Sequence, residues 1–164
     1  MNNLSKVIES KVKVRFPDCD PFNHLNNSKY LDYFLNARED QLIENYDFDL
    51  HKLAKEKGIS WVVGQSQITY MSPAVLMETV VIESKLIAFD AKSLTMEAIM
   101  WNEDKTIVKA LLWSKFVHFD LRTLRTQVHS EELTSFFEKI VAPFDSPVTF
   151  EERGKSFRFE KLLI

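Results

Sequence analysis

The sequence predicts an α+β fold in which a curled antiparallel β-sheet wraps around one long α-helix. Two patterns support this prediction: a long apolar helical pattern at about 28–44, and a later series of alternating strand patterns joined by short turns. A sheet that follows such a helix can bury its apolar side by curling around it. The length of 164 residues is typical of a single domain.

The first strand is predicted over 10–17, where apolar residues alternate with basic ones. A turn-rich connection over 17–27 follows it. The long helix over 28–44 is predicted from apolar residues at i, i+3, i+4 and i+7, namely Tyr30, Tyr33, Phe34 and Ala37. Asn26 or Asn27 can cap this helix, because an asparagine oxygen accepts hydrogen bonds from amides of the first turn.

A short helix is predicted over 50–57, between Asp49 as its amino-terminal cap and Gly58 as its stop. Gly64, inside the next strand, indicates a bulge or a close backbone approach. The short connections favour an antiparallel meander of four strands, over 59–71, 76–88, 93–101 and 106–119.

The last predicted helix covers 131–140, with Ser130 as its cap and two glutamates in its first turn. The tail after Pro143 is too apolar for a disordered segment. We therefore predict a domain over 1–142 and a C-terminal extension over 143–164 that packs on it. The extension can add a strand, cover the sheet or complete an interface; we favour an interface between copies of the chain.

Composition excludes several classes of function. Three glycines cannot supply the GxGxxG or GxxxxGK phosphate-binding motifs, and a net charge of −3 with mixed signs gives no nucleic-acid-binding surface. One cysteine excludes an internal disulfide, and the histidines lack the spacing of metal ligands, so we expect no metal. Without a signal peptide or a long apolar segment, the sequence favours a cytoplasmic protein with no membrane partner.

The densest polar cluster is the connection Asp18-Cys-Asp-Pro-Phe-Asn-His-Leu-Asn-Asn27. It lies between an apolar strand and an apolar helix, where a plain connection needs only a few residues. Two carboxylates, an imidazole and several amides meet there at a helix amino terminus, which suits a developing anion. A carboxylate at this point can act as a general base on water or as a nucleophile, so the cluster has the parts needed for acyl transfer.

The same residues also have structural interpretations. Asp20 can form an Asx turn with Pro21, and His24 can orient the loop through a backbone hydrogen bond. Asn26 and Asn27 are helix caps in the first place, and their contribution to catalysis would come through the amides that they position.

Two neighbours of Asp20 are not expected to react. Asp18 is suited to a turn, or to a salt bridge with Arg15 or Arg38. Cys19 lies between two carboxylates, which raise the pKa of its thiol and so disfavour the nucleophilic thiolate.

The run Val14-Arg-Phe-Pro-Asp-Cys-Asp-Pro-Phe-Asn-His-Leu-Asn-Asn-Ser-Lys-Tyr-Leu-Asp-Tyr-Phe-Leu-Asn-Ala-Arg38 resembles the opening of the hotdog-fold acyl thioesterases. This group includes 4-hydroxybenzoyl-CoA thioesterase and the acyl-ACP thioesterases, with the approximate pattern D-x-D-x-x-G-H-x-N-N-x-x-Y. Looser similarities follow in Gln67-Ile-Thr-Tyr-Met-Ser-Pro-Ala74 and Phe116-Val-His-Phe-Asp-Leu-Arg122. The resemblance covers about residues 8–138.

The resemblance implies the hotdog fold and hydrolysis of an acyl thioester carried on coenzyme A (CoA) or acyl carrier protein (ACP). It makes Asp20 the general base or nucleophile and places His24 beside the reacting carbonyl. It also implies that Asn26 and Asn27 open the helix whose amides polarise that carbonyl. No separate cofactor is implied, because CoA is part of the substrate. The family further implies a homodimer or homotetramer with active sites at subunit interfaces.

The chain departs from the family pattern at three places. Asn23 replaces the glycine before the histidine, Phe22 replaces an asparagine of the plant acyl-ACP enzymes, and the further acidic residue of those enzymes is missing near Ser72-Pro73. Asparagine is one of the few other residues that tolerate a left-handed backbone. A positive φ at Asn23 would therefore preserve the turn, whereas an extended Asn23 would place the active site in doubt.

Two other functions are compatible with the sequence. Hotdog enoyl-thioester hydratases also pair an acidic residue with a histidine, but their motif separates the two by five residues, whereas His24 follows Asp20 by four and Asp18 by six. A non-catalytic module that binds acyl thioesters is the second alternative. Release of free thiol distinguishes hydrolysis from both.

Overall fold

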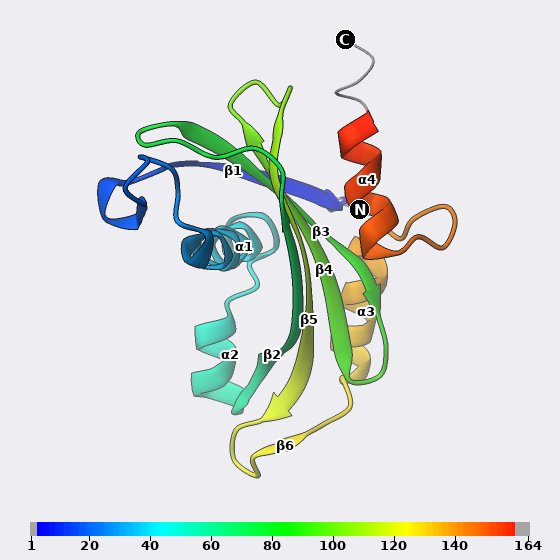
Figure 1. Cartoon of the computed structure of the whole chain (residues 1–164). Helices are drawn as coiled ribbons and strands as arrows, with labels where there is room; N and C mark the ends of the chain where they lie inside the picture. Colours follow the sequence, from blue (N-terminus) through cyan, green and yellow to red (C-terminus); the bar gives the residue numbers. More distant parts are fainter. Residues whose placement is uncertain (1–2, 160–164) are drawn as a thin grey trace.

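The computed structural model describes residues 3–159 and shows a six-stranded antiparallel sheet that curls around one long helix (Figure 1). The strands are β1 (Val7–Lys13), β2 (Ile59–Tyr70), β3 (Thr79–Phe89), β4 (Ser93–Asn102), β5 (Val108–Asp120) and β6 (Arg125–Thr126). The helices are α1 (Tyr30–Tyr46), α2 (Leu50–Lys57), α3 (Glu131–Ile140) and α4 (Phe150–Phe159). This arrangement confirms the predicted α+β fold.

The strands follow the order β1-β3-β4-β5-β2, and β6 pairs with β5. The sequence predicted a meander of four strands, but only β3, β4 and β5 pair in succession, because β2 pairs with β5 at the edge of the sheet and not with β3. The register shifts between Val63 and Gln65, which confirms the bulge expected at Gly64. Gly58 has a φ of 64° and ends α2, as predicted, and Asp49 caps that helix through the amides of His51 and Lys52.

The first strand was predicted over 10–17, but it begins earlier and ends earlier, at Val7 and Lys13. It stops at Lys13, and residues Phe16–Asp18 form a 3-10 turn instead of the last part of a strand. Pro17 has no amide to donate to a neighbouring strand, and its fixed φ suits the first turn of a helix. The chain therefore leaves the sheet before Pro17.

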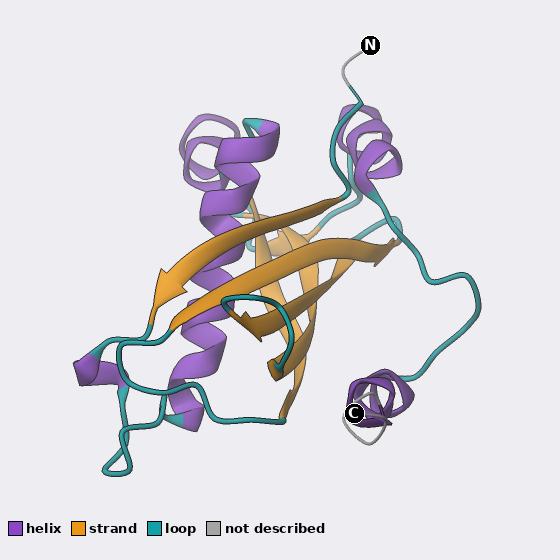
Figure 2. Cartoon of the chain, turned by 90° about the horizontal axis from the view of Figure 1, so that it is seen from above, coloured by secondary structure: helices purple, strands orange, loops and turns teal. Residues whose placement is uncertain are grey.

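The helix α1 lies across one face of the sheet (Figure 2). A first core fills the space between α1 and this concave face and includes the predicted α1 stripe. Phe34 is fully buried there against sheet residues such as Ile82 and Leu112. A second cluster lies on the convex face, around Ile99 and Leu111. The sheet thus separates two apolar layers.

The C-terminal extension supplies much of the convex layer. Phe150 and Phe157 of α4 pack against Trp113 and Trp101 of the sheet. The described part of the extension therefore covers its own sheet, which is one of the three roles considered from the sequence. The favoured interface role remains a prediction, and residues 160–164 lie outside the described part. Within residues 3–159, no helix has both the length and the apolar character needed to cross a membrane.

Candidate active site

The loop between β1 and α1 folds into a tight turn around the carboxylate of Asp20. Oδ1 of Asp20 accepts hydrogen bonds from the backbone amides of Phe22 (2.9 Å) and His24 (3.0 Å). The amide of Asp20 donates to the carbonyl oxygen of His24 (2.8 Å). The predicted Asx turn is therefore present, and it fixes the orientation of the carboxylate proposed from the motif.

One side of this turn remains open. Within residues 3–159, Oδ2 of Asp20 accepts no hydrogen bond, and the ring of His24 makes none. Both side chains are half-buried, and the rings of Phe22 and His24 lie 6.4 Å apart. The open oxygen of Asp20, Oδ2, and the imidazole of His24 are thus both available to water or to a ligand.

Asn23 has a φ of 61°, the left-handed conformation that the sequence argument required. Its carbonyl oxygen accepts a hydrogen bond from the amide of Leu76 (2.8 Å), which ties the turn to the β2–β3 connection. Asparagine therefore takes the place of glycine without loss of the turn.

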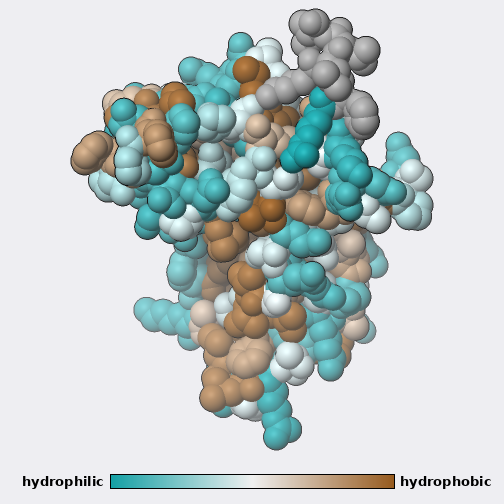
Figure 3. All heavy atoms as spheres, in the orientation of Figure 1, coloured by the Kyte–Doolittle hydropathy of each residue, from teal (hydrophilic) through white to brown (hydrophobic). Residues whose placement is uncertain are grey.

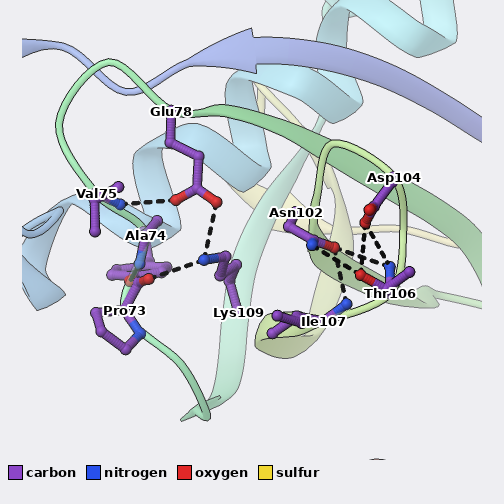
Figure 4. A network of polar contacts seen from close by, with 10 residues as sticks. Pro73, Ala74, Val75, Glu78, Asn102, Asp104, Thr106, Ile107 and Lys109 are labelled. Atoms are coloured by element: carbon purple, nitrogen blue, oxygen red, sulfur yellow. Dashed lines mark hydrogen bonds and ion pairs between the residues drawn. The ribbon is translucent and has the colours of Figure 1, made fainter.

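The connection that supports the turn is itself held by an ion pair (Figure 4). Lys109 on β5 lies 2.9 Å from a carboxylate oxygen of Glu78 and donates to the carbonyl oxygen of Pro73 (3.0 Å). The other Glu78 oxygen accepts from the amide of Val75 (2.8 Å).

Ala74 joins this connection to the loop, because its carbonyl oxygen accepts a hydrogen bond from the amide of Leu25 (2.8 Å). These contacts make the loop a rigid support for Asp20.

Asn26 and Asn27 stand at the entry to α1 but have different contacts. Oδ1 of Asn26 accepts from the amide (3.0 Å) and the hydroxyl (2.8 Å) of Ser28, so Asn26 caps the 3-10 turn Asn27–Lys29 that leads into the helix. The carbonyl oxygen of Asn27 accepts from the hydroxyl of Tyr70 (3.0 Å) at the end of β2. Asn26 therefore caps the turn before the helix, whereas the predicted asparagine cap of α1 itself is wrong, since the N-cap residue of α1 is Lys29 and its side chain makes no capping hydrogen bond.

Of the two roles considered for Asp18, the turn is confirmed, because Asp18 ends the 3-10 turn that starts at Phe16 and its amide donates to the carbonyl oxygen of Arg15 (3.1 Å). The alternative, a salt bridge with Arg15 or Arg38, is not formed within residues 3–159. Oδ2 of Asp18 accepts a short hydrogen bond from the hydroxyl of Tyr33 (2.6 Å). Burial, together with this bond, raises the pKa of Tyr33 to about 12. Burial and the charges of Asp18 and Asp20 raise the pKa of Cys19, which confirms that its thiol is not activated.

A cavity of about 210 Å³ lies further along the inner side of α1, between this helix, the sheet and α3. Its wall combines aliphatic and aromatic side chains, among them Leu42, Trp61, Met96, Phe116 and Phe137. Arg38 also lines it, although the sequence suggested only an ion-pair role for this residue. Helical periodicity places Arg38 near the apolar stripe of α1, but nothing in the sequence shows that the surrounding side chains leave a space beside it.

The comparisons with known proteins agree with this geometry. The thioesterase-like superfamily model matches residues 14–148. The long-chain acyl-CoA thioesterase FadM of Escherichia coli K12 is 32% identical over 134 residues, which are 82% of this chain and 99% of that protein. The crystal structure of YbaW, a probable thioesterase from Escherichia coli, has a TM-score of 0.71 and 30% identity, and covers 82% of this chain and 99% of its own.

More distant structures share the fold alone. SAV2348 from Staphylococcus aureus, solved in complex with CoA, has a TM-score of 0.73 at 15% identity, and the match covers 88% of this chain and 91% of that one. The sequence resemblance and the predicted hotdog fold are thereby confirmed. The chain belongs to the thioesterase-like superfamily and is a thioester hydrolase.

Proposed function

We propose that this hydrolase cleaves acyl-CoA thioesters with Asp20 as its catalytic carboxylate. The observation that carries the proposal is the Asp20 turn, in which two amides fix one carboxylate oxygen and leave the other open. The family membership supplies the reaction class, and the relative FadM is named for acyl-CoA substrates.

Two routes use the open oxygen of Asp20. As a general base, it takes a proton from water while the water oxygen attacks the thioester carbon; the C–S bond then breaks, and the thiolate leaving group takes up a proton. As a nucleophile, it forms a mixed anhydride with release of CoA, and water then hydrolyses the anhydride. Both routes give the free acid and CoA.

The entry to α1 can stabilise the oxyanion that forms in either route. Amides in the first turn of a helix have no carbonyl partner within that helix, and they lie at the positive end of the helix dipole. Asn26 orders this turn through Ser28 and keeps the amides in place. We assign His24, on the same loop, to a position beside the reacting carbonyl.

We further propose a homodimer formed through β2. No strand within residues 3–159 pairs with the outer edge of this twelve-residue strand, and Val62 and Val63 on it are 42% and 47% exposed. Figure 3 shows hydrophobic side chains along the face on which β2 lies. An unpaired strand edge of this length readily pairs with the same edge of another chain.

Antiparallel pairing of two β2 strands brings the end of one beside the beginning of the other. Tyr70, at the end of β2, bonds to Asn27 next to the Asp20 turn. Trp61, near the beginning of β2, lines the apolar cavity. The dimer would therefore place the Asp20 turn of one copy next to the cavity of the other, with the active site between subunits.

Thiol release from a series of acyl-CoA substrates tests the reaction. We expect Asp20→Asn to lower kcat by about 10² or more, because the amide can neither take a proton nor attack. Asp18→Asn is the matched control and keeps an acceptor oxygen for Tyr33, so it should retain most of the activity. Full activity in Asp20→Asn would overturn the assignment. Loss of enoyl absorbance without thiol release would indicate a hydratase, and binding without turnover would indicate a binding module.

Sedimentation tests the dimer. Val63→Lys puts a charge on the β2 edge and should shift the protein from dimer to monomer, with loss of activity. A fully active wild-type monomer would contradict the shared site, and a wild-type tetramer would show that a second surface also takes part.

A further inference from the structure

Arg38 is a buried cation with most of its hydrogen-bonding capacity unused. Its side chain lies on the inner face of α1, and the residue is 8% exposed. Nη1 donates to the hydroxyl of Ser84 (3.0 Å), which in turn donates to Oε1 of Gln41. Within residues 3–159, Nε and Nη2 of Arg38 have no hydrogen-bond partner.

No carboxylate in the described part of the chain pairs with this charge. Glu39, the next residue of α1, pairs with the exposed His51 instead. Burial lowers the pKa of Arg38 to about 10, so the guanidinium still carries its positive charge at neutral pH. A buried charge without a partner is strongly unfavourable, which sets Arg38 apart from an ordinary structural arginine.

The unused donors belong to a residue that lines the apolar cavity. Apart from Arg38 and Glu39, the cavity wall is aliphatic and aromatic. Its volume of about 210 Å³ exceeds the roughly 150 Å³ of a cavity that holds benzene, so a chain of about six carbons or more can enter. Nε and Nη2 lie side by side on a guanidinium and match the two oxygens of one carboxylate.

We propose that Arg38 binds a carboxylate at the far end of the acyl group, so that the preferred substrates are CoA monothioesters of medium-length dicarboxylic acids. The methylene chain occupies the apolar cavity, and the terminal carboxylate neutralises the guanidinium with two parallel hydrogen bonds. This proposal rests on the proposed hydrolysis of acyl-CoA and specifies its substrate class.

Matched pairs of substrates test the preference directly. Adipoyl-CoA and hexanoyl-CoA have acyl chains of equal length, as do suberoyl-CoA and octanoyl-CoA, and the members of each pair differ only at the far end. We expect kcat/KM to be about tenfold or more higher for the carboxyl-terminated member, the ratio typical of a charge-assisted hydrogen bond. Equal values, or a preference for the methyl-terminated member, would overturn the proposal.

Variants distinguish recognition from a structural role. Arg38→Met should lower the ratio of the two kcat/KM values at least tenfold, whereas a structural role would lower both values alike and leave the ratio unchanged. Arg38→Lys keeps the charge without the paired donors and should give an intermediate ratio. This variant provides the test if Arg38→Met does not fold. Lys155→Met, which removes an exposed cation that does not line the cavity, is the control and should preserve the preference.

Binding of the free acids separates this proposal from the proposed function. Calorimetry should show suberate binding to the wild type at least tenfold more tightly than to Arg38→Met, whereas 1-octanol, which has no carboxylate, should bind the two proteins alike. If no acyl-CoA is hydrolysed but suberate still binds through Arg38, the reaction assignment fails and the carboxylate site stands. If acyl-CoA is hydrolysed and suberate gains nothing from Arg38, only the carboxylate site fails.

Discussion

A buried charge lies on each face of the sheet, and the two charges differ in the number of their hydrogen-bond partners. On the convex face, Glu97 is 1% exposed and accepts hydrogen bonds from Nε and Nη2 of Arg153 (2.9 Å each) and from Nε1 of Trp113 (2.8 Å). On the concave face, Arg38 is also buried, but among the residues that the structure describes its one hydrogen-bond partner is Ser84. The charge of Glu97 thus has partners that hold the fold together, whereas Arg38 keeps hydrogen-bond donors that are open to a ligand.

The largest effect on stability is expected when the convex charge loses its main partner. Arg153→Met leaves the carboxylate of Glu97 buried, with Lys85 3.9 Å away as its remaining cation. We expect a loss of about 3 kcal/mol in the free energy of unfolding, measured with urea. Replacement of the exposed Lys155 by Met is the control on the same helix and should cost far less. An equally small loss in Arg153→Met would show that the pair does not hold α4 in place.

A smaller loss is expected when Glu97 loses its neutral donor. Trp113→Phe keeps the aromatic contact with Phe150 but removes the indole N–H. The expected cost is about 1–2 kcal/mol, because the bond involves a charged acceptor. In the double variant with Arg153→Met, the losses should not add, since both act on the same carboxylate. Additive losses would mean that the two residues act independently.

The concave side contains a pair of buried histidines whose stability effect depends on pH. The rings of His118 and His129 stack 4.8 Å apart, and Trp61 donates to Nε2 of His129. Burial lowers the pKa of both residues, and for His118 the neighbouring His129 lowers it further. Asp120 and Asp90 raise these pKa values, but less than burial lowers them.

Because the folded pKa values lie below the unfolded value of about 6.5, the unfolded chain takes up protons first as the pH falls. The stabilisation is therefore complete above pH 6.5 and is lost as the pH drops towards the folded values. Urea midpoints between pH 7.5 and 5 should show this decline, and the variant His118→Phe with His129→Leu should flatten it. An identical decline in the variant would assign the acid sensitivity to other groups.

The smallest effect on stability is expected at Arg38. Arg38→Met removes a cation that has no counter-ion in the described part of the chain, so we expect the free energy of unfolding to change by less than about 1 kcal/mol, or to rise. This outcome would contrast with Arg153→Met, although both substitutions remove a buried or half-buried arginine. A loss as large as that of Arg153→Met would remove the distinction between the two faces.

The sequence was most informative where local rules decide the structure. The α2 helix and α3 were predicted to the residue because Asp49, Gly58 and Ser130 mark their ends. The Asp20 turn was also predictable, because its hydrogen bonds join residues two and four positions apart. The roles of Asp20, His24, Asn26 and Asn27 in catalysis stay predictions.

Features that depend on distant parts of the chain were not predictable. The α4 helix contains Gly154 and has no clear apolar stripe, so its position depends on Glu97 and on tryptophans of the sheet. The environment of Arg38 depends in the same way on side chains from both helices and strands. Spacing along the sequence shows neither an ion pair across 56 residues nor a space between packed elements.

The pairing of β2 with β5 has a consequence for the order in which the chain folds. Tyr70 pairs with Ala110, so this ladder closes a loop of about 40 residues, whereas β3, β4 and β5 are joined by short turns. Contacts between distant residues form slowly, so the central hairpins should be protected from hydrogen exchange early during refolding, and β2 later. The strand that we expect to meet a second copy should thus be among the last to join the sheet, so we expect any assembly to follow the folding of each chain.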